Sequence, residues 1–184
     1  MKKLMIVAAI AMAAFASDAA QYVWKNKTAG KIYDGNATST YTGTAYIYGN
    51  KGATTQEKIF ALLAGTAEGD WKALSLDNNS VSSGSISSKD PTTDYFTYDG
   101  DISAFIVIDD GDKFYIGPTQ GATDPGLGTG TINFEVGKTE SQKIIGAASD
   151  GWKGAGWYTA VPEPTSGLLL LLGVAGLALR RRRA

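Results

Sequence analysis

The sequence contains no cysteine and no histidine, and these two absences exclude several classes of protein chemistry. Without cysteine the fold has no disulfide bond to stabilise it, although an oxidising compartment remains permitted. Without histidine there is no histidine-based catalytic triad, the commonest general base is missing, and nearly all standard zinc sites are excluded. We expect no metal site and no cofactor, and an enzyme with this sequence would depend on carboxylates.

Positive charge is scarce between the two ends of the chain. Residues 20–160 hold 11 lysines and 16 acidic side chains, which gives a net charge of −5. Because binding to phosphate groups requires a positive surface, nucleic acid is not expected as a partner. A mildly acidic domain of this size suits a soluble protein that is exported.

Long apolar runs are restricted to the two ends. Lys2 and Lys3 precede an apolar stretch at residues 4–15, and small residues follow it. This order is typical of a secretory signal peptide, which signal peptidase removes. Cleavage is predicted after Ala19, with Ala16 as the alternative position. The other interpretation is an N-terminal membrane anchor that is retained.

The C-terminal end begins with an extended segment and continues with an apolar run. Two prolines surround one acid in Pro162-Glu163-Pro164, and they disfavour helix at this point. Residues 167–179 carry no polar side chain. As a helix they would be about 20 Å long, which is short for a hydrocarbon core of about 30 Å.

Basic side chains complete the C-terminal end. Four arginines follow the apolar run directly: Arg180, Arg181, Arg182 and Arg183. Basic residues beside an apolar segment stay on the cytoplasmic side of a membrane. The tail therefore predicts a short transmembrane helix at residues 167–179 that leaves the bulk of the protein outside. A buried core helix with a basic terminus is the other interpretation.

An N-terminal signal combined with a Pro-Glu-Pro triplet, a short apolar helix and a terminal arginine cluster resembles the PEP-CTERM sorting signal of bacterial surface and matrix proteins. The resemblance covers Val161–Ala184. It implies that exosortase, an integral-membrane cysteine transpeptidase, cuts the chain near the motif. It also implies that Pro162, Glu163 and Pro164 are the recognition residues and that Arg180 to Arg183 stop the segment in the membrane.

The chain divides into a signal peptide at residues 1–19, an exported domain at 20–160 and the sorting signal at 161–184. The central domain is rich in glycine, serine, threonine and asparagine, and its apolar runs are short. This composition favours strands joined by turns. We therefore expect a mainly β fold, a small antiparallel β-sandwich or open barrel with one or two short helices. The signal helix and the C-terminal apolar helix would flank it.

Local patterns give the expected elements. Strands are predicted at residues 44–48, 81–86, 102–108, 113–116, 131–136 and 156–160. The segment 102–108 is the most apolar and is expected to be central. The acidic turn at 109–112 would join it to 113–116 as a β-hairpin.

Two helix starts are indicated by capping patterns. Thr54 and Glu57 fit a capping box, in which each side chain bonds to the other residue's free backbone N–H, and Gly65 is placed to end that helix. A weaker cap at residues 139–142 precedes Ile144 and Ile145. We expect a second short helix there.

The central domain offers three kinds of candidate site. Trp71, Trp152 and Trp157 are candidate glycan contacts, because aromatic rings stack on sugars, but core packing is the alternative role for each. The acidic turns at 99–101 and 109–112 lie at opposite ends of one predicted strand, which favours plain turns over a weak calcium site. No pair of carboxylates is marked as catalytic.

The leading hypothesis is an exported, non-catalytic protein. It would be held for a time in the inner membrane, processed by exosortase, and delivered to the cell surface or to an extracellular polysaccharide matrix. The alternative is a carbohydrate-binding module that uses exposed tryptophan and tyrosine side chains. A weaker alternative is a small secreted hydrolase that uses carboxylates alone.

Overall fold

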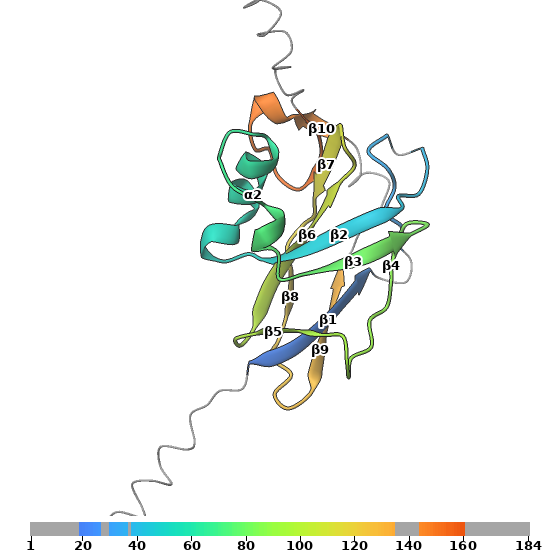
Figure 1. Cartoon of the computed structure of the whole chain (residues 1–184), viewed down its shortest axis with the longest axis vertical. Helices are drawn as coiled ribbons and strands as arrows, with labels where there is room; N and C mark the ends of the chain where they lie inside the picture. Colours follow the sequence, from blue (N-terminus) through green and yellow to red (C-terminus); the bar gives the residue numbers. More distant parts are fainter. Residues whose placement is uncertain (1–18, 27–29, 37, 135–143, 161–184) are drawn as a thin grey trace, which may run out of the picture.

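The computed structural model describes residues 19–26, 30–36, 38–134 and 144–160 (Figure 1). Several predictions made above fall on other residues and lie outside this description. They concern Ala16, the helix cap at 139–142, and the whole sorting segment at 161–184 with its recognition triplet and arginines.

The described chain folds into two β-sheets with helices packed on the larger one, which confirms the predicted mainly β class. The strands are β1 (Ala20–Asn26), β2 (Gly43–Gly49), β3 (Asp77–Ser82), β4 (Ser85–Ile86), β5 (Phe96–Tyr98), β6 (Ile102–Asp109), β7 (Lys113–Ile116), β8 (Gln120–Ala122), β9 (Thr129–Phe134), β10 (Ile144–Ala147) and β11 (Gly156–Thr159). The helices are α2 (Gln56–Leu63) and the 3-10 turns η1 (Gly52–Thr54), η2 (Lys72–Leu74) and η3 (Ala148–Asp150).

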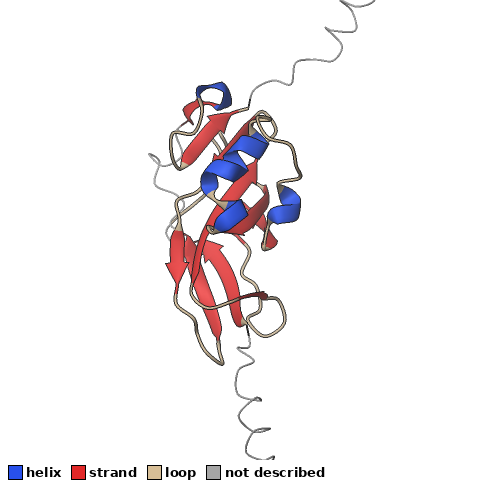
Figure 2. Ribbon diagram, turned by 90° about the vertical axis from the view of Figure 1, so that its left-hand side faces the viewer, coloured by secondary structure: helices blue, strands red, loops and turns tan. Residues whose placement is uncertain are grey.

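The two sheets have different sizes. The smaller has the order β5-β1-β9, and the larger follows β10-β11-β7-β6-β2-β3-β4, with β8 also paired to β6. In Figure 1 the small sheet lies in the lower part of the molecule, whereas β7, β10 and α2 lie in the upper part. Figure 2 shows the helices gathered in the upper half.

Two strand pairs are parallel, whereas the sequence predicted antiparallel pairing only. β1 pairs with β9 from Gln21 opposite Thr129 to Asn26 opposite Phe134, which covers the whole of β9. β10 pairs with β11, and η3 lies in the connection that returns the chain for this parallel pairing. Most of the described chain lies between β1 and β9, whereas only residues 148–155 join β10 to β11. A local sequence pattern carries no information about the partner or direction of either pair.

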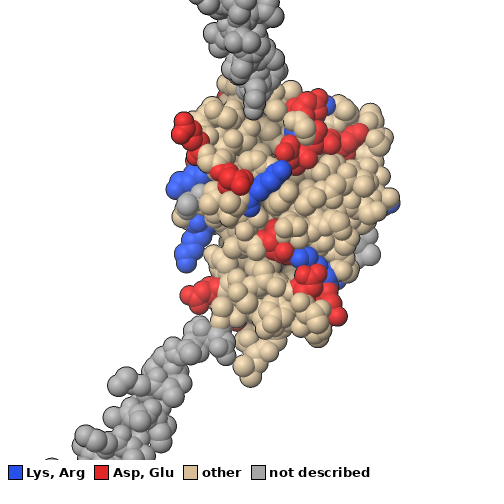
Figure 3. Space-filling model, in the orientation of Figure 1, with Lys and Arg blue, Asp and Glu red and all other residues tan. Residues whose placement is uncertain are grey.

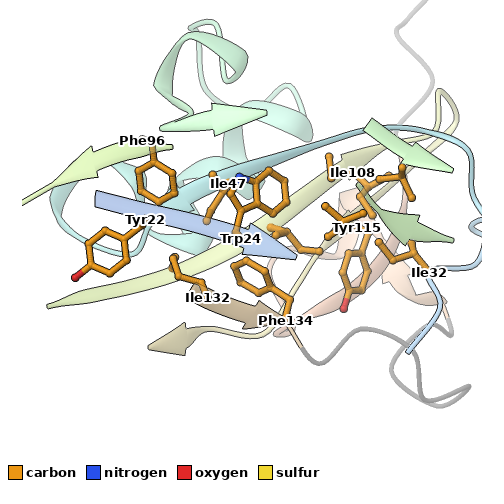
Figure 4. Packing of buried hydrophobic residues seen from close by; sticks show 14 of the residues in the cluster. Tyr22, Trp24, Ile32, Ile47, Phe96, Ile108, Tyr115, Ile132 and Phe134 are labelled. Atoms are coloured by element: carbon orange, nitrogen blue, oxygen red, sulfur yellow. The ribbon is translucent and has the colours of Figure 1, made fainter. Parts of the chain in front are cut away.

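The central strand β6 is buried on both faces. Ile106 and Ile108 point into the core between the two sheets, where they belong to the same cluster as Trp24 of β1 and Phe134 of β9 (Figure 4). Phe105 belongs to the second cluster on the opposite face, together with residues of α2. Strands covered on both sides read as continuous apolar runs, so the prediction of a central strand at 102–108 is confirmed.

The helix α2 covers the second face of the large sheet by burying Ile59 and Phe60. The predicted capping box is wrong, because Thr54 lies in η1 and its hydroxyl donates to the carbonyl oxygens of Gly49 and Lys51. The predicted end of the helix is confirmed. Gly65 has a φ of +68°, and its N–H donates to the Leu62 carbonyl as in a Schellman motif.

Two further segments differ from their predictions. Residues 81–86 form a hairpin in place of one strand, because Ser83 and Gly84 both adopt positive φ and turn the chain between β3 and β4. Ile144 and Ile145 belong to strand β10 and not to a helix, since pairing with β11 decides their conformation. The hairpin of β6 and β7 is as predicted.

Truncation of Ile106 to alanine should lower the free energy of unfolding by about 2–5 kcal/mol, because it leaves a cavity in the core between the sheets. Urea denaturation of the purified protein would measure the loss. Leu127→Ala is the matched control, since Leu127 is fully exposed and should change stability by less than about 0.5 kcal/mol. Equal losses in the two variants would contradict the core described here.

Candidate functional site

The described chain ends inside the large sheet, next to the predicted sorting segment. Strand β11 pairs with β7 on one side and with β10 on the other. Beyond the strand, the Ala160 N–H donates to the Asp112 carbonyl oxygen at 2.8 Å. The last residue before Val161 therefore still has a backbone partner in the fold.

The side chains of β11 anchor it in both cores. Trp157 lies in the core between the two sheets and Tyr158 lies under α2, and both are fully buried. The Tyr158 ring contacts Phe60 at a centroid distance of 4.8 Å and stacks on Phe114 at 5.5 Å. Burial of this large aromatic surface stabilises the attachment point of the C-terminal segment.

The Tyr158 hydroxyl also binds the turn that precedes its own strand. It donates to the Gly154 carbonyl oxygen at 2.6 Å and accepts the Lys153 N–H at 2.9 Å. Burial raises the pKa of Tyr158 above its ordinary value, so the hydroxyl keeps its proton and its role as donor at neutral pH.

The neighbouring strand β7 is supported by a loop near its start. Lys113 pairs with Thr159 across the sheet, and its Nζ donates to Oδ1 of Asn36. The Gly35 backbone packs so closely on the Lys113 side chain that a Cβ at this position would collide with it. The loop therefore covers the sheet beside the end of β11.

Asp34 fixes the conformation of this loop. Its carboxylate accepts the Ser39 hydroxyl at 2.8 Å, the Thr38 N–H at 3.0 Å and the Asn36 N–H at 3.1 Å. The hydrogen bond from the Ser39 side chain is the main cause that lowers the pKa of Asp34 from 3.8 to about 2, and bonds from Thr38 add to it. The ionised carboxylate is thus the form that the folded loop prefers.

At the other end of the domain, Ala19 is exposed and Ala20 is the buried first residue of β1. A cut after Ala19 would leave the new N-terminus directly at the first strand, and this cleavage stays a prediction. The described chain begins at the lower end of the molecule in Figure 1 and ends at the upper end.

The tryptophans predicted as glycan contacts have different surroundings. The prediction is wrong for Trp157, because its ring is fully buried against Tyr115 at a centroid distance of 5.4 Å. Its burial follows from its position opposite Tyr115 in the pair of β11 and β7, which the sequence did not reveal.

Trp71 and Trp152 are half-buried and pack against the cluster under α2. Trp71 meets the Tyr46 ring edge-on at 5.1 Å, so the two rings form no flat surface. Trp152 stacks on Tyr158 at 5.9 Å. Both rings contribute to packing, and glycan contact stays a prediction for these two residues.

Each of the two acidic turns has a carboxylate that accepts a backbone hydrogen bond, in one case from another loop and in the other from within the turn. Asp101 accepts the Asp124 N–H at 2.8 Å, and Asp109 accepts the Gly111 N–H at 3.1 Å. Within the described ranges, no three aspartate or glutamate side chains gather in a way that could hold a metal ion. Figure 3 shows acidic and basic side chains scattered over a largely uncharged face.

None of the helices in the described ranges has the length and apolar character needed to cross a bilayer. The predicted transmembrane helix at residues 167–179 lies outside those ranges.

Comparison with known proteins places a recognised signal at the C-terminus. Residues 160–183 match the family model of the PEP-CTERM protein-sorting motif. This finding confirms the resemblance drawn from the sequence, and the motif implies an exported protein that exosortase processes. Searches of curated proteins and of solved structures found no match for the chain.

Protonation of Asp34 should loosen the loop at residues 34–39. Because the folded pKa lies below the ordinary 3.8, the stabilisation is complete above about pH 4 and is lost as the pH falls through about 2. An NMR titration of the carboxyl group, read together with amide exchange of Thr38, would measure this. Ser39→Ala should move the pKa of Asp34 upward, whereas an unchanged value near 3.8 in the unmodified protein would contradict the bonds described.

Proposed function

We propose that this protein is an exported, non-catalytic component of the bacterial cell surface or extracellular matrix. The observation that carries the proposal is the match to the sorting motif at residues 160–183, which begins where the β domain ends. In this arrangement the domain is the cargo and the C-terminal segment determines its destination.

The proposed order of events follows from the charges and lengths of the two ends. Signal peptidase would remove residues 1–19 during export, and the domain would fold outside the inner membrane. Residues 167–179 would hold the chain in the bilayer, with Arg180 to Arg183 kept on the cytoplasmic side by their charge. Exosortase would then recognise Pro162-Glu163-Pro164 and separate the domain from its tether.

The absence of catalysis is part of the proposal. The sequence has no histidine to act as a general base. Asp34, Asp101 and Asp109 all accept hydrogen bonds from nearby backbone N–H groups, which is a structural use of their charge. A matrix role also suits a mildly acidic domain that folds without disulfide bonds.

Simultaneous replacement of Pro162, Glu163 and Pro164 by alanine should leave uncut precursor in the membrane fraction, because the recognition residues are gone. Immunoblotting of membrane and extracellular fractions would measure the ratio of precursor to product. Simultaneous Thr165→Ala and Ser166→Ala is the matched control and should be processed normally. Normal processing of the triplet variant would refute the proposed recognition.

Mass spectrometry of the mature C-terminus gives an independent check. The protein recovered from the cell surface or medium should end close to the triplet and lack residues 167–184. Recovery of the full-length chain from the cytosol, with residues 1–19 and 167–184 still present, would contradict the whole proposal.

A further inference from the structure

We propose that the folded domain itself restrains its processing, because the end of β11 must leave the large sheet before exosortase can take up the recognition triplet. This inference rests on the proposed function and concerns the regulation of the same site. It assigns to β11 a role in the timing of release.

The first step of the argument is the distance along the chain. Ala160 is bonded through its N–H to Asp112, and Pro162 is only two residues further on. A fully extended chain covers at most about 3.6 Å per residue, so the two residues from Ala160 to the triplet allow a reach of about 7 Å at most. A membrane peptidase that binds the triplet would meet the folded domain directly.

The second step is the state of the backbone that precedes the triplet. A peptidase needs a segment whose backbone is free of other partners and whose side chains are exposed. In β11 the opposite holds, since Trp157 and Tyr158 are fully buried and the strand pairs with a neighbour on each side. The residues immediately N-terminal to Val161 are thus unavailable in the closed sheet.

The third step links access to stability. Strand ends open locally with free energies below that of global unfolding. When opening is fast compared with cleavage, the rate of proteolysis follows the population of the open form. The contacts of Tyr158 with Gly154, Lys153 and Phe60 stabilise the closed form, so they should slow processing.

Two matched tyrosine variants test this link. Tyr158→Phe removes a hydroxyl that donates to the Gly154 carbonyl beside β11, and Tyr22→Phe removes one that donates to the Gly100 carbonyl at 2.7 Å in the small sheet. Both rings are buried. Tyr22 belongs to β1 of the small sheet, which lies in the lower part of Figure 1, whereas the described chain ends in the upper part. Tyr158→Phe therefore loses two hydrogen bonds beside the site, and Tyr22→Phe loses one far from it.

The experiment is a pulse-chase of the full-length precursor in cells that contain the peptidase. Loss of the two hydrogen bonds of the Tyr158 hydroxyl should raise the open population, and with it the rate of processing, at least about threefold in Tyr158→Phe. The Tyr22→Phe precursor should be processed at the same rate as the unmodified chain. Equal rates in Tyr158→Phe and the unmodified chain, or equal acceleration in both variants, would overturn the inference.

A pair of insertions keeps the inference testable if Tyr158→Phe fails to fold. Four residues, Gly-Ser-Gly-Ser, placed between Ala160 and Val161 move the triplet away from the sheet and should speed processing at least about threefold, because β11 no longer needs to open. The same insertion between Ser166 and Gly167 lengthens the tether and leaves the number of residues between Ala160 and the triplet unchanged, so it should not accelerate cleavage. Acceleration by the second insertion alone would overturn the inference.

The outcomes separate this inference from the proposed function. If the triple alanine variant is processed normally, the triplet is not the residue set that exosortase recognises. The proposed function is then refuted, and the restraint by β11 fails with it. If that variant stays uncut while the first insertion leaves the rate unchanged, recognition stands and only the restraint by β11 is overturned.

Discussion

Burial of both faces of β6 is the constraint on which the rest of the structure depends. The chain has no cysteine, so stability rests on packing and hydrogen bonds. On one side of β6, Ile106 and Ile108 pack in the same cluster as residues of the small sheet and Trp157 of β11. On the other side, Phe105 and Val107 pack in the cluster that contains α2 and Tyr158 of β11. Because β6 connects both clusters, the fixed position of β11 is a consequence of the same packing.

The sequence predicted those elements whose signals are local. The β6–β7 hairpin follows from two apolar runs joined by an acidic turn, in which Gly111 adopts a φ of +80°. The end of α2 at Gly65 follows in the same way from the tolerance of glycine for positive φ. The sorting segment is equally a linear signal, and the family match confirms it.

Elements decided by distant partners were not predictable from the sequence. Thr54 has a residue type that is common at helix caps, but its hydroxyl donates to the carbonyl oxygen of Gly49 and not to the start of the helix. Trp157 had the residue type of a glycan contact, and pairing with β7 buried it. Ile145 followed a cap-like pattern and joined a parallel strand. For Trp157 and Ile145 a partner on another strand outweighed local preference, whereas the partner of Thr54 lies only five residues earlier in the chain.

The parallel pair of β1 and β9 has a consequence for the order of assembly during translocation. β1 ends at Asn26 and its partner strand begins only at Thr129, so the contact order of this pair is high. A chain delivered N-terminus first exposes Tyr22 and Trp24 without their sheet until most of the domain has crossed. Exposed apolar surface of this kind makes a chain prone to aggregation, so the interval before β9 arrives is the vulnerable stage of assembly.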